Sequence, residues 1–238
     1  MAITHIFFDL DGTLVDSLPG ISFSATEALA RVCPGKTIPD FSPFIGPPIR
    51  DIFQLALQAE DVDLLDRLCL AFRQSYDSQG WTKTKVYPGV NRVIASLYDS
   101  GMICRVLTNK PLVPTLRILR HLSLDGFMSE VITPDKRSPG FASKIEAALD
   151  AQSRHSLTGT CALVVGDSSD DGAAAEACGF QFAAVTYGYG AAHRLTRPSV
   201  HFKLKQFADL LEVVWSSRTS SIGDHLDPDP IRGNTSCD

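Results

Sequence analysis

Short apolar runs that are typical of buried strands alternate with amphipathic stretches that are typical of helices along most of the chain. The strand-like runs lie at residues 3–8, 102–107, 130–133, 161–165 and 182–186. The helix-like stretches of this part lie at residues 90–100, 115–121, 144–151, 171–178 and 207–215. Strands and helices in this order predict an α/β fold with a parallel sheet and right-handed crossovers.

One long stretch interrupts this alternation with helices alone. Apolar residues recur at helical spacing from Ile21 to Val32, and two more amphipathic helices are predicted at 50–59 and 63–76. We therefore expect a helical domain, residues 18–83, inserted into an α/β core made of residues 1–17 and 84–215. Residues 216–238 are polar and lack apolar periodicity, which predicts a flexible tail.

Composition narrows the class of protein. The 238 residues are 44% hydrophobic and 21% charged, as in an ordinary globular protein, and the net charge of −5 argues against a nucleic-acid surface. No apolar run is long enough to span a bilayer, and no signal sequence opens the chain. The six cysteines show no CxxC spacing, which favours reduced thiols. We expect a cytoplasmic protein that binds neither nucleic acid nor membrane.

Two acids follow the first apolar run directly, in the segment Asp9-Leu10-Asp11-Gly12-Thr13. Ligands of open α/β sheets bind beyond the carboxyl ends of the strands, and carboxylates there are costly unless a cation or a phosphorylated ligand meets them. A calcium loop is excluded, because the twelfth position counted from Asp9 is Gly20 and a strand precedes the segment. The structural alternative is a polar turn at the end of a strand.

Three other segments place polar side chains at predicted strand ends. Thr108-Asn109-Lys110 follows residues 102–107, and Gly166 to Asp171 follows residues 161–165. The segment after residues 130–133 supplies Lys136, Arg137 and Lys144. Because the carboxyl ends of parallel strands share one edge of a sheet, we expect these groups to converge.

This set resembles the haloacid dehalogenase (HAD) superfamily of aspartate-nucleophile hydrolases, from Ala2 to about Trp215. Residues 9–13 resemble its first motif, Thr108 its second, and residues 166–171 its fourth. The resemblance implies a Rossmann-like parallel-sheet core and identifies the helical insert with the all-helical cap domain of the superfamily. Residues 87–90, 108–110 and 185–190 further resemble the phosphoglycolate phosphatase branch.

The third motif is where the chain departs from the family pattern. Many relatives carry a Lys-Pro pair, and the nearest match here is Ser138-Pro139. The segment from Ser143 to Glu146 has the form of a capping box, which places Lys144 at the first position of a helix. A lysine is unfavourable there on dipole grounds, so its presence favours a role in binding an anion. We therefore favour Lys144 as the motif-three lysine, with Lys136 as the alternative.

The resemblance implies roles for these residues in phosphoryl transfer. Asp9 is the expected nucleophile, which forms an aspartyl-phosphate, and Asp11 is the expected acid and base. Thr108 and Lys144 are expected to hold the phosphoryl oxygens. The expected ligands of Mg²⁺ are Asp9, Asp11 through its backbone carbonyl, Asp167 and Asp171. Dehalogenases of the superfamily lack an Asp at the position of Asp11, which favours phosphotransfer here.

The remaining candidates concern the substrate. Gly12, Thr13, Asn109 and Lys110 are expected near it, and Arg50 is either a ligand of a substrate carboxylate or a solvated helix residue. The expected substrate is a small phosphorylated metabolite, first of all 2-phosphoglycolate. The alternatives are a sugar-phosphate phosphatase or phosphomutase, a nucleotidase or a pyrophosphatase. A non-catalytic binding protein is the alternative from another class, and the intact Asp9 and Asp11 argue against it.

Overall fold

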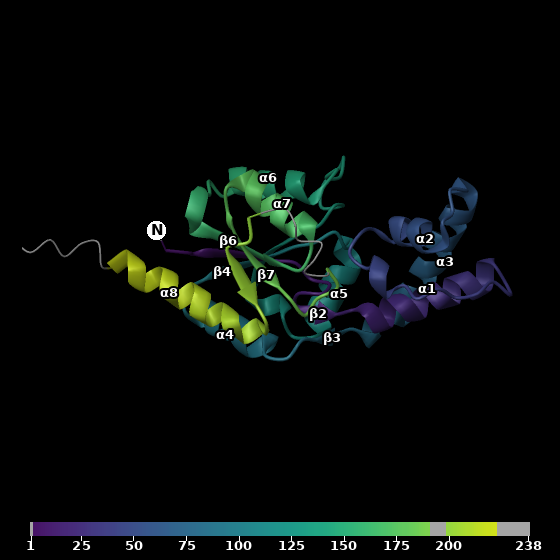
Figure 1. Ribbon diagram of the computed structural model, residues 1–238, viewed down its shortest axis with the longest axis horizontal. Helices are drawn as coiled ribbons and strands as arrows, with labels where there is room; N and C mark the ends of the chain where they lie inside the picture. Colours follow the sequence, from purple (N-terminus) through teal and green to yellow (C-terminus); the bar gives the residue numbers. More distant parts are fainter. Residues whose placement is uncertain (1, 191–198, 223–238) are drawn as a thin grey trace, which may run out of the picture.

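The fold is built on one parallel sheet with helices on both faces (Figure 1). The structure is a computed structural model that describes residues 2–190 and 199–222. The sheet has the order β5-β4-β1-β6-β7-β8, and every neighbouring pair is parallel. Its strands are β1 (His5–Phe8), β4 (Ile103–Leu107), β5 (Met128–Ile132), β6 (Ala162–Gly166), β7 (Gln181–Val185) and β8 (Phe202–Leu204). The predicted fold class is confirmed.

Both faces of the central strands are buried, which explains why these strands are apolar without interruption. Ile6 and Phe8 lie in one apolar layer with α4 (Val90–Asp99), α5 (Leu112–His121) and α8 (Leu210–Ile222). Phe7 lies in the opposite layer with α6 (Lys144–Arg154) and α7 (Ser169–Cys178). Figure 1 shows α6 and α7 above the sheet and α4 and α8 below it.

A separate helical lobe, which we call the cap, lies at the right of Figure 1. It consists of α1 (Leu18–Val32), α2 (Ile49–Leu57), α3 (Val62–Ser78) and 3-10 turns at Ser42–Phe44 and Gly80–Lys83. Its own core holds the rings of Phe41, Phe53 and Phe72, whose centroids lie 5.9 Å and 6.2 Å apart in edge-to-face pairs. The cap therefore buries apolar surface independently of the sheet.

Two short strands join the cap to the core. β2 (Val15–Asp16) and β3 (Lys85–Val86) pair in antiparallel fashion, with Val15 opposite Val86 and Asp16 opposite Lys85. The chain therefore enters and leaves the cap through adjacent segments of backbone.

The C-terminal third differs from the prediction at two places. β8 is a three-residue strand beside β7 that sequence periodicity did not reveal. Helix α8 continues to Ile222 and so occupies the first part of the segment predicted as a tail. The Ser216 and Ser217 hydroxyls donate to the carbonyls of Glu212 and Val214, both at 2.7 Å, so these polar side chains find partners on the helix itself. Residues 223–238 of the predicted tail lie outside the described residues.

Within residues 2–190 and 199–222, no helix combines the length and apolarity that a membrane span requires.

Candidate active site

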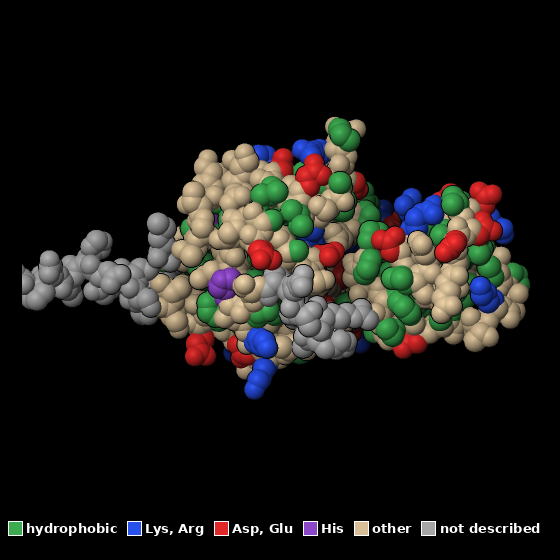
Figure 2. All heavy atoms as spheres, turned by 45° about the horizontal axis from the view of Figure 1, so that its top comes forward, with side chains coloured by type: hydrophobic (Ala, Val, Ile, Leu, Met, Phe, Trp, Pro, Cys, Tyr) green, Lys and Arg blue, Asp and Glu red, His purple; other side chains and the backbone are tan. Residues whose placement is uncertain are grey.

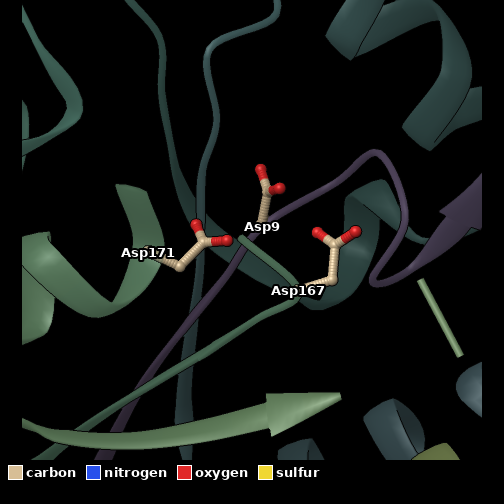
Figure 3. Close-up of side chains that lie close together, drawn as sticks. All are labelled: Asp9, Asp167 and Asp171. Atoms are coloured by element: carbon tan, nitrogen blue, oxygen red, sulfur yellow. The ribbon is translucent and has the colours of Figure 1, made fainter. Parts of the chain in front are cut away.

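Three buried carboxylates meet where β1 and β6 end (Figure 3). Asp9 follows β1, Asp167 follows β6, and Asp171 lies in the first turn of α7. One oxygen from each carboxylate lies within 4.8 Å of the others, and the three residues are at most 7% exposed. β1 and β6 are neighbours in the sheet, so the topology brings together acids that are far apart in sequence.

The loop after β7 holds Asp167 in place. The Oδ2 atom of Asp167 accepts hydrogen bonds from the backbone N–H groups of Tyr189, at 2.7 Å, and Gly190, at 2.9 Å. The Thr13 hydroxyl, which is fully buried, donates to Oδ1 at 3.5 Å. Gly12 has φ +84°, and a Cβ at this position would overlap the Asp167 carboxylate. Gly12 and Thr13 therefore shape the wall beside Asp167.

Asp171 has a structural role in addition to its place in the cluster. Its Oδ2 atom accepts from the N–H and hydroxyl of Ser168 at 3.0 Å and 2.6 Å, which forms a capping box at the start of α7. Its Oδ1 atom accepts from Lys144 Nζ at 2.7 Å. The neighbouring Asp170 is exposed and accepts from the Asn109 side chain at 3.2 Å.

Lys144 is the cation of this cluster. It is the first residue of α6, and the Ser143 side chain caps the helix by accepting from the Glu146 N–H. Lys144 Nζ lies 3.0 Å from Asp9 Oδ1, in addition to its contact with Asp171. Burial disfavours the ammonium ion, but the two carboxylates outweigh that cost and raise the pKa of Lys144 above its usual value.

The two alternatives to Lys144 lie elsewhere. Lys136 Nζ contacts the Glu130 carboxylate at 3.2 Å and the Val131 carbonyl at 2.7 Å. Arg137 pairs with Glu146 and Asp150. The structure thus brings Lys144 to Asp9 and leaves Lys136 and Arg137 in other ion pairs.

A second ion pair joins Lys110 to Asp11, which lies two residues after Asp9 in the sequence. Lys110 Nζ is 2.9 Å from Oδ2 and 3.1 Å from Oδ1 of Asp11, and the Tyr76 ring of the cap has its centroid 5.0 Å from Nζ. Burial lowers the pKa of Lys110, but Asp11 and Tyr76 together raise it above its usual value. Lys110 is therefore charged at neutral pH and holds the Asp11 carboxylate at the boundary between core and cap.

Thr108 lies at the same edge of the sheet as Asp9. It follows β4, whose Val106 pairs with Phe8 of β1, and it is 4% exposed. Its hydroxyl accepts from the Lys110 N–H at 3.2 Å. Thr108 and Asp9 therefore emerge side by side from adjacent strands.

The charges of the cluster fit a divalent cation. Burial raises the pKa of Asp9 well above its usual range, and Asp171, Asp167 and Asp11 raise it further, while Lys144 opposes them. Burial and the charge of Asp171 raise the pKa of Asp167 to about 6, although two backbone N–H groups favour its ionised form. One ammonium ion faces three carboxylates, and clustered carboxylate oxygens are the ligands that Mg²⁺ prefers.

A cavity of about 500 Å³ lies between the core and the cap. Asp11, Asn109 and Lys110 line it from the core, while Arg73 and Tyr76 belong to its cap side. Figure 2 shows a hollow at this boundary, in which acidic side chains are visible.

The structure does not bring Arg50 to the other site residues. Arg50 pairs with Asp66 of the cap, and its side chain is 39% exposed. The cavity is lined instead by Arg73, which lies one turn before Tyr76 on α3.

Three contact residues of the site were not singled out from the sequence. Ser168 lies inside the fourth motif, and its S-x-x-D spacing before a helix is a signal that could have identified it. Tyr189 and Arg73 carry no such local signal, because their positions depend on how a loop and a cap helix lie against the core.

Comparison with known proteins identifies the family of the chain. Residues 6–185 match the haloacid dehalogenase-like hydrolases. The phosphoglycolate phosphatase of Cereibacter sphaeroides is 32% identical over 218 residues, which cover 87% of this chain and 96% of that protein. The tyrosine-protein kinase PtkA of Mycobacterium tuberculosis is 29% identical over 197 residues, which cover 82% of this chain and 66% of the kinase.

A solved structure agrees with the fold as well. The haloacid dehalogenase-like hydrolase from Streptococcus pneumoniae is 26% identical and superposes with a TM-score of 0.79, covering 89% of this chain and 98% of that one. The family resemblance drawn from the sequence motifs is thereby confirmed. The chain belongs to the haloacid dehalogenase-like hydrolases.

Proposed function

We propose that the chain is a Mg²⁺-dependent phosphatase that hydrolyses a phosphomonoester through an aspartyl-phosphate on Asp9. The observation that carries the proposal is the arrangement around Asp9. Its buried carboxylate faces Lys144 at 3.0 Å, and Asp11, two residues later, is held by Lys110 at 2.9 Å. The family membership and the phosphoglycolate phosphatase relatives support the same reaction class.

Asp9 and Asp11 have different roles in the proposed reaction. The Asp9 carboxylate attacks phosphorus, and Asp11, in its protonated form, gives a proton to the leaving oxygen. Asp11 then takes a proton from the water that hydrolyses the acyl phosphate, which restores the Asp9 carboxylate and the protonated form of Asp11. The contact with Lys110 positions the Asp11 side chain at the cavity, beside the place that this mechanism gives to the leaving oxygen.

Lys144 and Thr108 bind the phosphoryl oxygens as negative charge redistributes over them. Both are buried, so their interaction with charge is weakly screened. Asp9, Asp167 and the Asp11 carbonyl would hold Mg²⁺, and Asp171 contributes its charge while it orients Lys144. When bound, the metal neutralises the repulsion between the carboxylates and the phosphoryl group.

The substrate in this proposal is a small phosphorylated metabolite of the cytoplasm, without nucleic acid or membrane as partner. 2-Phosphoglycolate is the reference ester, because curated relatives at about 30% identity carry its name. A first panel compares kcat/KM, with Mg²⁺, for 2-phosphoglycolate, a sugar phosphate, a nucleoside monophosphate and pyrophosphate. Turnover of none of them would favour the non-catalytic alternative.

Asp9→Asn tests the mechanism. Loss of the nucleophile should lower kcat by about 10⁴-fold or more and abolish acid-stable labelling of the protein by a ³²P-labelled ester. The matched control is Asp170→Asn, because Asp170 lies outside the carboxylate cluster. Turnover retained in Asp9→Asn, in protein that unfolds at the wild-type temperature, would refute the nucleophile assignment.

A further inference from the structure

The cavity between core and cap is larger than the reference ester requires. Its volume of about 500 Å³ lies within the range of pockets that enclose ligands of drug size, about 300–1,000 Å³. 2-Phosphoglycolate contains only two carbon atoms, so most of the cavity would remain filled with water.

The walls of the cavity are mainly apolar. Ile21, Ile52 and Phe72 face it from the cap helices, and Val113 and Pro114 face it from α5 of the core. Water against such walls is unfavourable compared with an apolar group of matching size. The lining therefore favours an occupant with an apolar body.

The position of Asp11 indicates which end of the cavity lies nearest to the carboxylate cluster. Asp11 lines the cavity, whereas Asp9, Asp167 and Asp171 do not. A phosphoryl group bound at Asp9 therefore has its leaving oxygen beside Asp11. The alcohol part of such an ester would then extend past Lys110 and Tyr76, which line the cavity next to Asp11.

Most charged side chains that line the cavity already have an ion-pair or hydrogen-bond partner. Asp11 pairs with Lys110, and Asp77 pairs with Arg117 at 3.7 Å. Asp135 accepts hydrogen bonds at 2.8 Å from the Leu112 N–H and the Thr133 hydroxyl.

Arg73 is different. Among the residues that the structure describes, no carboxylate or carbonyl is hydrogen-bonded to or ion-paired with its guanidinium. It lies on α3 one helical turn before Tyr76, whose ring contacts Lys110. A free guanidinium in the wall of a cavity is suited to bind a carboxylate or a second phosphate in a bidentate manner.

We propose that the substrate is a phosphomonoester whose alcohol part has an apolar body about the size of an aromatic ring, with a second anionic group that binds Arg73. This inference rests on the proposed phosphatase function. It gives Arg73 the role that the sequence had suggested for Arg50, which is to bind an anionic group of the substrate.

Three esters separate the contributions of the apolar body and the second anion. 4-Carboxybenzyl phosphate has both, benzyl phosphate has the ring alone, and 2-phosphoglycolate has the carboxylate alone. We expect kcat/KM to fall in that order, by at least tenfold between the first and the last. A preference for 2-phosphoglycolate over both benzyl esters would overturn the inference and leave the phosphatase function intact. Hydrolysis of none of the esters would refute the phosphatase function and the inference together.

Arg73→Gln tests the anion contact. It should lower kcat/KM for 4-carboxybenzyl phosphate by about fivefold, mainly through KM, and change benzyl phosphate less than twofold. Because Arg73 is exposed, the substitution leaves the cap core untouched. The matched control is Arg67→Gln, an exposed arginine of the same helix that does not line the cavity. An equal effect of Arg73→Gln on both benzyl esters, or an equal effect of Arg67→Gln, would refute the assignment of Arg73.

Discussion

At the scale of single residues, Lys144 illustrates how tertiary contacts override local preference. A positive charge in the first turn of a helix opposes the helix dipole, at a cost of about 0.3–1 kcal/mol. The contacts with Asp9 and Asp171, at 3.0 Å and 2.7 Å in a buried setting, outweigh this cost. A lysine in this position therefore stabilises two carboxylates that would otherwise repel each other.

Removal of Lys144 should affect both turnover and stability. Lys144→Ala is expected to lower kcat by about 10²–10³-fold, because a charge that stabilises the transition state is lost. It should also lower the free energy of unfolding by about 3–5 kcal/mol at neutral pH, because buried carboxylates lose their partner. Steady-state kinetics and urea unfolding measure the two effects.

Lys136→Ala is the control, since Lys136 is 35% exposed and contacts Glu130 instead. It should leave kcat within twofold of the wild type. If Lys136→Ala alone abolishes turnover, Lys144 is not the motif-three lysine.

The same scale shows what the sequence could and could not reveal about the site. Asp9, Asp11 and Asp167 were predictable, because each follows an apolar run whose burial is evident from its residues. Lys144 was preferred over Lys136 on a local capping signal that the structure contains. Arg50 and Arg73 are indistinguishable in sequence, because only the packing of α2 against α3 pairs Arg50 with Asp66.

At the scale of elements, the loop after β7 connects the carboxylate cluster to the cap. The Tyr189 N–H donates to Asp167, and the Tyr189 hydroxyl donates to Asp16 Oδ1 at 2.7 Å. The same hydroxyl accepts from the N–H groups of Ser17, at 2.7 Å, and Leu18, at 2.9 Å. Tyr189, a residue of the core, thus binds the backbone at the amino end of α1, the first cap helix.

Tyr189→Phe separates these two contacts. It removes the hydroxyl but keeps the backbone N–H that binds Asp167, so Mg²⁺ affinity should change less than twofold. The free energy of unfolding should fall by about 1–2 kcal/mol, and amide hydrogen exchange at Ser17 and Leu18 should accelerate. Tyr98→Phe is the control, because Tyr98 is 51% exposed on α4. Unchanged exchange at both amides would show that the hydroxyl does not hold α1.

Elements with a strong apolar face were predicted within three residues at each end, from α1 to β7. β2 and β3 have two residues each and β8 has three, which is too short for a period of two to be visible. The end of α8 was missed because residues 216–221 are polar and show no apolar periodicity.

At the scale of the whole molecule, the carboxylate cluster links stability to pH and, in the proposed function, to metal binding. Because the folded chain raises the pKa of Asp167 from 3.8 to about 6, it binds more protons at this site than the unfolded chain does in that range. The contribution of Asp167 to the free energy of unfolding therefore falls as pH rises from about 4 to about 6, and it is absent above pH 6. A bound cation favours the ionised carboxylates, so the stabilisation that it provides should increase as pH rises.

We expect Mg²⁺ to stabilise the fold more at pH 7.5 than at pH 5. At a concentration 100 times its dissociation constant, the gain at pH 7.5 should be about 2.7 kcal/mol. Urea unfolding with EDTA and with Mg²⁺ at the two pH values measures this difference. Asp167→Asn should remove most of the gain, and Asp170→Asn should retain it. Equal stabilisation of the wild type at both pH values would contradict the assignment of the cluster as the metal site.

The antiparallel pair of β2 and β3 has a consequence for how such a protein diversifies. Since Val15 lies opposite Val86, the whole cap leaves and rejoins the core at one point, and a two-residue hairpin turn could close that gap. The segment between them could therefore be shortened or replaced without altering the register of the strands that precede Asp9, Thr108 and Asp167. If the proposed function holds, the cap side of the cavity can therefore change, and the substrate with it, while the residues around Asp9 stay the same.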